Sequence, residues 1–232
     1  MTRIAGILFD KDGTLFDFNA TWAVWAHGVI ERLSRGDAGL AARMADAIGF
    51  LPAQMRFASG SPVIAGTPAE VAGYLLAHLP GRALDELVAE LDAAAQTAPQ
   101  VAAVPLAPCL GELQAQGLRL GVCTNDSEAA ARAHLDAAGV AQLFDMIVGY
   151  DSGYGEKPAA GPLLAFAQRV GLEPATIAMV GDSPHDLHAA RAAGMVAVGV
   201  LSGPADEATL APLADVVLPD ISALAAWVGR RG

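Results

Sequence analysis

Short apolar runs recur through the second half of this chain, each bounded by turn residues and followed by a longer stretch that suits a helix. Several of these runs show little polar alternation, which is typical of strands that are covered on both faces of a parallel sheet. Strand and helix alternation of this kind predicts an α/β fold, with helices on both faces of a mostly parallel sheet. We expect strands at 4–9, 119–124, 145–150, 177–181, 195–200 and 215–218, and helices at 107–117, 127–138, 159–171, 185–193 and 220–230.

The stretch from about 17 to 100 has a different pattern. It is compatible with helices at 20–34, 38–48, 67–79 and 82–97, and only the segment "GSPVIAGTP" (60–68) interrupts it with glycine and proline. We therefore expect a helical insertion at 17–100 after the first strand, and a core made of 1–16 and 101–232.

Composition limits the function classes. The chain has 232 residues, 53% of them hydrophobic, which is enough for a substantial core. Asp plus Glu number 25 against 14 Lys plus Arg, so there is no basic field for nucleic acid or an anionic membrane. Two cysteines are too few for a disulfide framework, and no apolar run approaches the roughly 18 residues of a membrane span. We expect a soluble, cytoplasmic monomer or homodimer.

Polar residues gather where the predicted strands end. In open parallel sheets, ligands bind beyond the carboxyl ends of the strands, so these side chains should share one cleft. Crowded carboxylates repel one another, which favours a raised pKa or a bound cation, and oxygen ligands of this kind suit Mg²⁺ with a phosphate beside it. The residues are Asp10, Asp12, Thr124, Asn125, Lys157, Asp182 and Asp186.

Four motifs then carry a family resemblance. "FDKDGTL" (9–15), "CTN" (123–125), "EKP" (156–158) and "GDSPHD" (181–186) together resemble, in order and spacing, the signature motifs of the haloacid dehalogenase-like hydrolase superfamily. The helical insertion looks like that superfamily's first-type cap, and the chain is most similar to its phosphoglycolate phosphatase branch. The resemblance implies a Rossmann-like three-layer core with a small helical cap, and a Mg²⁺-dependent phosphoric monoester hydrolase.

The resemblance also assigns roles to the motif residues. Asp10 would be the nucleophile that forms an aspartyl-phosphate. Asp12 would protonate the leaving oxygen and then deprotonate the hydrolytic water. Thr124 would donate a hydrogen bond to the phosphoryl group, and Lys157 would neutralise the nucleophile and the phosphoryl oxygens.

The family's metal and phosphate ligands follow from the same motifs. The metal would be held by Asp10, Asp12, Asp182 and Asp186, and the phosphoryl oxygens by the turn at Gly13 and by Asn125. Structural alternatives stay open: Asp12 as a turn former, Asp182 and Asp186 as helix N-terminal charges, and Thr124 as the cap of a helix near Ser127.

Two further motif residues are less defined. Lys11 departs from the apolar residue often found between the two aspartates, and we expect it to be solvated or to support the site from behind rather than to contact substrate. His185 is expected to be a variable position rather than a ligand.

The residues that this sequence has and lacks exclude or disfavour several reactions known in the family that it resembles. The only lysines are Lys11 and Lys157, so the insertion offers none for the Schiff base of a phosphonate hydrolase. The dehalogenases of this superfamily lack the second aspartate and the metal, so the presence of Asp12 argues against a dehalogenase. Trp22 stands where the β-phosphoglucomutase type has a cap histidine, and His27 comes later. A small-molecule phosphomonoesterase remains, with a sugar phosphomutase, a phosphatase of broad range and a non-catalytic binding protein as alternatives.

Substrate choice is expected to lie in the insertion. The candidates are Asn19, Trp22, His27 and Arg56, with the 58–67 loop. Arg56 could bind a carboxylate or a second phosphate through its paired N–H groups, or be an exposed structural arginine. Trp22 shares a helix face with Trp25, so core packing is its alternative.

Overall fold

A computed structural model describes residues 3–231, and its centre is a six-stranded sheet. Every neighbouring pair of strands in it is parallel, as expected. The strand order is β5-β4-β1-β6-β7-β8. The strands are β1 (Gly6–Phe9), β4 (Arg119–Cys123), β5 (Met146–Val148), β6 (Ile177–Gly181), β7 (Val196–Val200) and β8 (Val216–Leu218).

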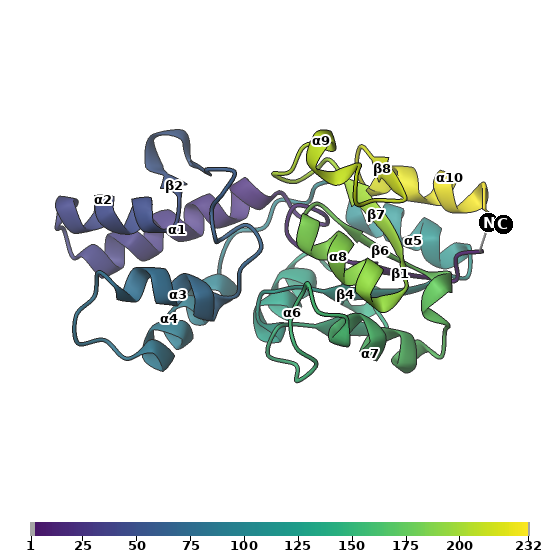
Figure 1. Ribbon diagram of the computed structural model, residues 1–232, viewed down its shortest axis with the longest axis horizontal. Coiled ribbons are helices and arrows are strands. Elements are labelled where there is room, and N and C mark those ends of the chain that lie inside the picture. Colours follow the sequence, from purple (N-terminus) through teal and green to yellow (C-terminus); the bar gives the residue numbers. More distant parts are fainter. Residues whose placement is uncertain (1–2, 232) are drawn as a thin grey trace.

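Helices cover both faces of this sheet, which makes three layers (Figure 1). One buried cluster packs α5, α6 and α10 against the sheet through residues such as Leu110, Leu135 and Trp227. The other packs α7 and α8 through Phe166 and Leu187. The expected Rossmann-like core is confirmed. Its helices are α5 (Leu106–Ala115), α6 (Glu128–Ala137), α7 (Gly161–Val170), α8 (Pro184–Ala193), the short α9 (Glu207–Leu210) and α10 (Leu224–Gly229).

The insertion forms a helical unit with its own hydrophobic core, beside the sheet in Figure 1. Asp17 and Asp37 cap two of its helices by accepting hydrogen bonds from backbone N–H groups, and Thr67 with Glu70 forms a capping box on a third. We call this unit the cap and the remainder the core. Its elements are α1 (Phe18–Ser34), α2 (Ala38–Ala47), a hairpin of β2 (Phe50–Leu51) and β3 (Arg56–Phe57), α3 (Pro68–Leu76) and α4 (Leu84–Gln96).

Two backbone crossings join the cap to the core. They lie side by side, because Asp17 N donates to Val101 O at 2.8 Å and Ala103 N donates to Leu15 O at 2.9 Å. The division at residues 16/17 and 100/101 stays a prediction. Among the described residues, no helix is both long and apolar enough to cross a membrane.

Candidate active site

The strand register brings the predicted motifs together. Phe9, the last residue of β1, pairs with Val122 of β4 on one side and with Val180 of β6 on the other. The residues that follow these three strands therefore meet at one edge of the sheet, and Asp10 N donates to Val180 O at 2.8 Å. This is why motifs that are more than 100 residues apart share one cleft.

Gly13 makes the turn after Asp12 and has no room for a side chain. Its φ is +81°, in the left-handed region that favours glycine, and its N–H donates to Phe16 O at 2.7 Å. A Cβ at this position would overlap a carboxylate oxygen of Asp182. The turn and the carboxylate are thus packed directly against each other, and the N–H of Gly13, expected to bind a phosphoryl oxygen, is used within the turn instead.

Asp10, Asp182 and Asp186 form a buried acidic cluster. Each offers a carboxylate oxygen, and these oxygens lie within 4.8 Å of one another. Lys157 Nζ lies between two of them, 2.6 Å from Asp10 Oδ1 and 2.6 Å from Asp186 Oδ1. The other oxygen of Asp186 accepts hydrogen bonds from Ser183 at the start of α8, so Asp186 also has the capping role that the sequence left open.

The electrostatics of this cluster favour a cation. Burial raises the pKa of the Asp10 carboxyl from 3.8 to about 7; Lys157 opposes the rise, and Asp186 and Asp12 add to it. Burial, with Asp10 and Asp186, also raises the pKa of Asp182 well above its ordinary value. Burial would lower the pKa of Lys157, but Asp10 and Asp186 outweigh it and raise that pKa. The all-oxygen donor set fits a hard divalent ion such as Mg²⁺.

Thr124 and Asn125 follow β4. Thr124 Oγ1 accepts from Asp126 N at 3.1 Å, whereas Ser127 rather than Thr124 caps α6. Asn125 Nδ2 donates to Ala65 O and to Lys157 O, each at 2.9 Å, and Asn125 Oδ1 accepts from Lys157 N at 2.9 Å. Both amide hydrogens of Asn125 are therefore used to hold the Lys157 loop and a cap loop, which makes it a positioning residue in this arrangement.

Lys11 is fully buried, which excludes the solvated position and leaves the other expected role, support of the site from behind. Its ammonium group lies 2.7 Å from Asp12 Oδ2, 3.3 Å from Asp126 Oδ2 and 2.9 Å from His134 Nδ1. It also lies 5.4 Å from the ring centroid of Trp22. Asp12 and Asp126 raise the pKa of Lys11 against the opposing effect of burial.

His134 links this ammonium group to the cap. Its Nε2 lies 2.8 Å from Ala95 O in α4. Burial, with Lys11, lowers the pKa of His134 to about 4, so the ring is neutral at pH 7. Since a lysine only donates, His134 accepts from Lys11 at Nδ1 and donates to Ala95 from Nε2. Sequence reasoning missed Asp126 and His134, although Asp126 directly follows the "CTN" motif.

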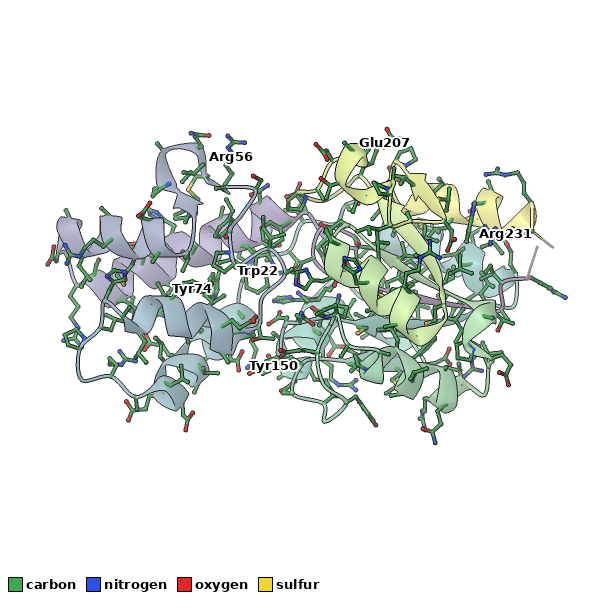
Figure 2. The ribbon with its side chains drawn as sticks, viewed as in Figure 1. Trp22, Arg56, Tyr74, Tyr150, Glu207 and Arg231 are labelled. Carbon is green, nitrogen blue, oxygen red and sulfur yellow. The ribbon has the colours of Figure 1, made fainter. Side chains whose placement is uncertain are left out.

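A cavity of about 60 Å³ lies where the cap meets this cleft. Trp22 and Trp25 border it, with ring centroids 5.3 Å apart in an edge-to-face arrangement. Figure 2 shows Trp22 near the boundary between cap and core. The core side of the lining is polar and consists of Asp10, Asp12, Thr124, Asn125, Asp126, Lys157, Ser183 and His185.

The other cap candidates lie elsewhere. Arg56 does not line this cavity: it is exposed on the hairpin, donates to Gln54 Oε1 at 2.6 Å, and lies toward the outside of the cap in Figure 2. Of the two alternatives for Arg56, this placement agrees with the exposed structural arginine and not with a residue that faces the substrate. Asn19 accepts from Phe57 N at 3.3 Å and holds α1 to the hairpin, also outside the lining. His27 borders a separate surface cavity.

The family model for haloacid dehalogenase-like hydrolases matches residues 4–194. The chain belongs to this family. It is 41% identical to the phosphoglycolate phosphatase of Rhodospirillum rubrum over 120 residues, which are 52% of this chain and 50% of that protein. It is also 41% identical to that of Escherichia coli K12 over 98 residues, 42% of this chain and 39% of that protein. The expected family and branch are confirmed, and the matches span at most about half of each relative.

Solved structures agree on the fold. A haloacid dehalogenase-like hydrolase from Bacteroides fragilis matches with a TM-score of 0.71 and 24% identity, covering 96% of this chain and all of that one (100%). A β-phosphoglucomutase from Clostridium difficile matches with a TM-score of 0.68 and 15% identity, covering 95% of this chain and 93% of the other. At these identities the likeness concerns the fold alone.

Proposed function

We propose that this chain is a Mg²⁺-dependent phosphatase that hydrolyses a small-molecule phosphomonoester through an aspartyl-phosphate on Asp10. The observation that carries this proposal is Lys157, whose ammonium group contacts both Asp10 and Asp186 within a buried carboxylate cluster that also contains Asp182. The family match and the phosphoglycolate phosphatase relatives support the same reaction class.

In the first step, an Asp10 oxygen attacks phosphorus while the bond from phosphorus to the leaving oxygen breaks. Lys157 offsets negative charge on the nucleophile and the phosphoryl oxygens. The N–H groups of Lys11 and Asp12 and the Thr124 hydroxyl orient the phosphoryl group, because the N–H of Gly13 already donates to Phe16 O. Asp10, Asp182 and Asp186 would hold Mg²⁺, which would supply further charge neutralisation. Asp12, also predicted as a metal ligand, lies outside this carboxylate cluster, and its carboxylate contacts Lys11. Asp12 gives its proton to the leaving oxygen, which departs as a neutral alcohol.

In the second step, a water attacks the phosphorus of the aspartyl-phosphate and Asp12 takes its proton. Inorganic phosphate leaves and the Asp10 carboxylate is restored, so atoms and charge balance over the two steps. Lys11 contacts both oxygens of the Asp12 carboxylate and so fixes the direction in which this group faces the cavity.

The test is phosphate release from a panel of phosphomonoesters with and without Mg²⁺, beside an Asp10→Asn variant. We expect metal-dependent release that the variant loses. Absence of release from every ester by well-folded protein would refute the phosphatase proposal and move attention to a mutase or a binding role.

A further inference from the structure

The cavity at the candidate site has two chemically opposite sides. The core contributes the carboxylates, Lys157 and the other polar groups, whereas every lining residue of the cap is apolar. Within residues 3–231, the cap thus places no charged side chain on the lining. The cap side includes Phe18, Trp22, Trp25, Ile64, Val71 and Leu91.

Several polar groups of the cap side already have hydrogen-bond partners within the cap. Gly66 N donates to Pro62 O at 3.0 Å, and Ile64 N donates to Ser61 O at 3.2 Å. The indole N–H of Trp25 donates to Leu91 O at 3.4 Å. At the start of α3, the Glu70 carboxylate accepts from Thr67 N and already occupies the end of the helix that would attract an anion.

The two lysines near the cavity, both in the core, already form ion pairs. Lys157 contacts Asp10 and Asp186, and Lys11 contacts Asp12 and Asp126. With Asp182, five carboxylates face two ammonium groups. A divalent ion would be balanced by the phosphate ester that binds beside it. A further anion on the leaving group would then find no lysine or arginine free of an ion pair on the described lining. The core's other side-chain donors there are Asn125, His185 and the hydroxyls of Thr124 and Ser183, and the excess of carboxylates would repel the anion.

We infer that the leaving group of the substrate carries no anionic group and is compact and apolar on the side that faces the cap. The inference rests on the proposed phosphatase function. The cavity volume of about 60 Å³ is well below the roughly 300 to 1,000 Å³ of sites for drug-sized ligands, so a small alcohol fits it best. The inference predicts that phosphoglycolate is a poor substrate of this chain, because its leaving group, glycolate, carries a carboxylate. The likeness to phosphoglycolate phosphatases covers about half of the chain.

Three esters with the same branched skeleton test the inference: isobutyl phosphate, the amide of phosphoglycolate, and phosphoglycolate itself. We expect kcat/KM to fall in that order, with phosphoglycolate at least about 100-fold below isobutyl phosphate, because an unpaired carboxylate beside like charges is strongly disfavoured. Equal or faster turnover of phosphoglycolate would overturn the inference. Phosphocholine is included, and its preference over isobutyl phosphate would overturn the claim that the leaving group is apolar on the side that faces the cap.

A charge placed on the cap wall should reverse the discrimination. Ile64 is half-buried on a loop that lines the cavity, so Ile64→Arg introduces a guanidinium group there, and Ile64→Gln is the neutral control. We expect arginine, but not glutamine, to raise the ratio of phosphoglycolate to isobutyl phosphate turnover at least about tenfold. If Ile64→Arg is poorly folded by circular dichroism, Val63→Arg provides the same charge from the neighbouring position.

These outcomes separate two kinds of failure. An unchanged ratio in a folded arginine variant would show that a missing cation does not set the preference, and would overturn the inference alone. If the wild-type protein hydrolyses none of the four esters, the proposed function is refuted, and the inference that rests on it is refuted as well.

Discussion

Replacing Asp10 with asparagine should stabilise the metal-free protein at pH 8. Burial raises the pKa of Asp10 from 3.8 to about 7, so the folded protein holds a proton that the unfolded chain has lost between these pH values. Stability therefore falls as pH rises through this window, and above it the ionised carboxylate costs on the order of 4 kcal/mol at 1.36 kcal/mol per pKa unit. Asparagine removes that charge but leaves Lys157 with one carboxylate partner fewer, so we expect a net gain of about 2 to 4 kcal/mol.

Urea unfolding in EDTA at pH 8 and pH 5 measures this effect. The gain from Asp10→Asn should shrink at pH 5, where the wild-type carboxyl is protonated. Asp37→Asn is the matched control, because Asp37 caps α2 at an exposed position where asparagine serves equally well, and we expect a change within about 0.5 kcal/mol. A loss of stability in Asp10→Asn at pH 8 would show that the ion pair with Lys157 outweighs burial, and would refute this reasoning.

The remaining predictions concern the metal, Lys11 and His134. Mg²⁺ at about 100 times its dissociation constant should raise the unfolding free energy of the wild type by about 2.7 kcal/mol and that of Asp10→Asn by less; equal gains would place the ion elsewhere. Lys11→Met should lower kcat/KM at least about tenfold more for isobutyl phosphate than for p-nitrophenyl phosphate, because Lys11 positions the proton donor Asp12 and the p-nitrophenyl leaving group needs little protonation. An equal loss for both esters would indicate that Lys11 has a structural role only. Burial lowers the pKa of His134 from 6.5 to about 4, so its contribution to stability is present above pH 6.5 and is lost as pH falls toward 4. Between these pH values the unfolding free energy of the wild type should fall by about 3 kcal/mol more than that of His134→Gln. Unfolding free energies that fall in parallel in the two proteins would contradict this prediction.

The sheet and the motif cleft could be predicted from sequence because both depend on local patterns. Apolar runs without polar alternation occur as buried parallel strands, and the carboxyl ends of β1, β4 and β6 bring Asp10, Thr124 and Asp182 to one edge. The short hairpin of β2 and β3 and the single turn of α9 were missed, since segments of two to four residues have no measurable periodicity.

The environment of Lys11 could not be predicted in the same way. Its three polar partners come from the adjacent residue and from positions 126 and 134, and the last of these reaches the cap through Ala95. Nothing local to "FDKDGTL" indicates that the lysine is buried. Likewise, Arg56 is in the cap but on the outer hairpin, a placement that depends on how α1 and the hairpin pack.

The central claim is that Asp10 is phosphorylated during turnover. The most direct measurement is to quench the enzyme in acid during steady-state turnover, trap any acyl phosphate with borohydride, and locate the reduced residue by peptide mass spectrometry. We predict reduction at Asp10 that requires both substrate and Mg²⁺ and is absent from Asp10→Asn. Continued phosphate release by Asp10→Asn, or turnover of the wild type without a trapped acyl phosphate on Asp10, would contradict the account.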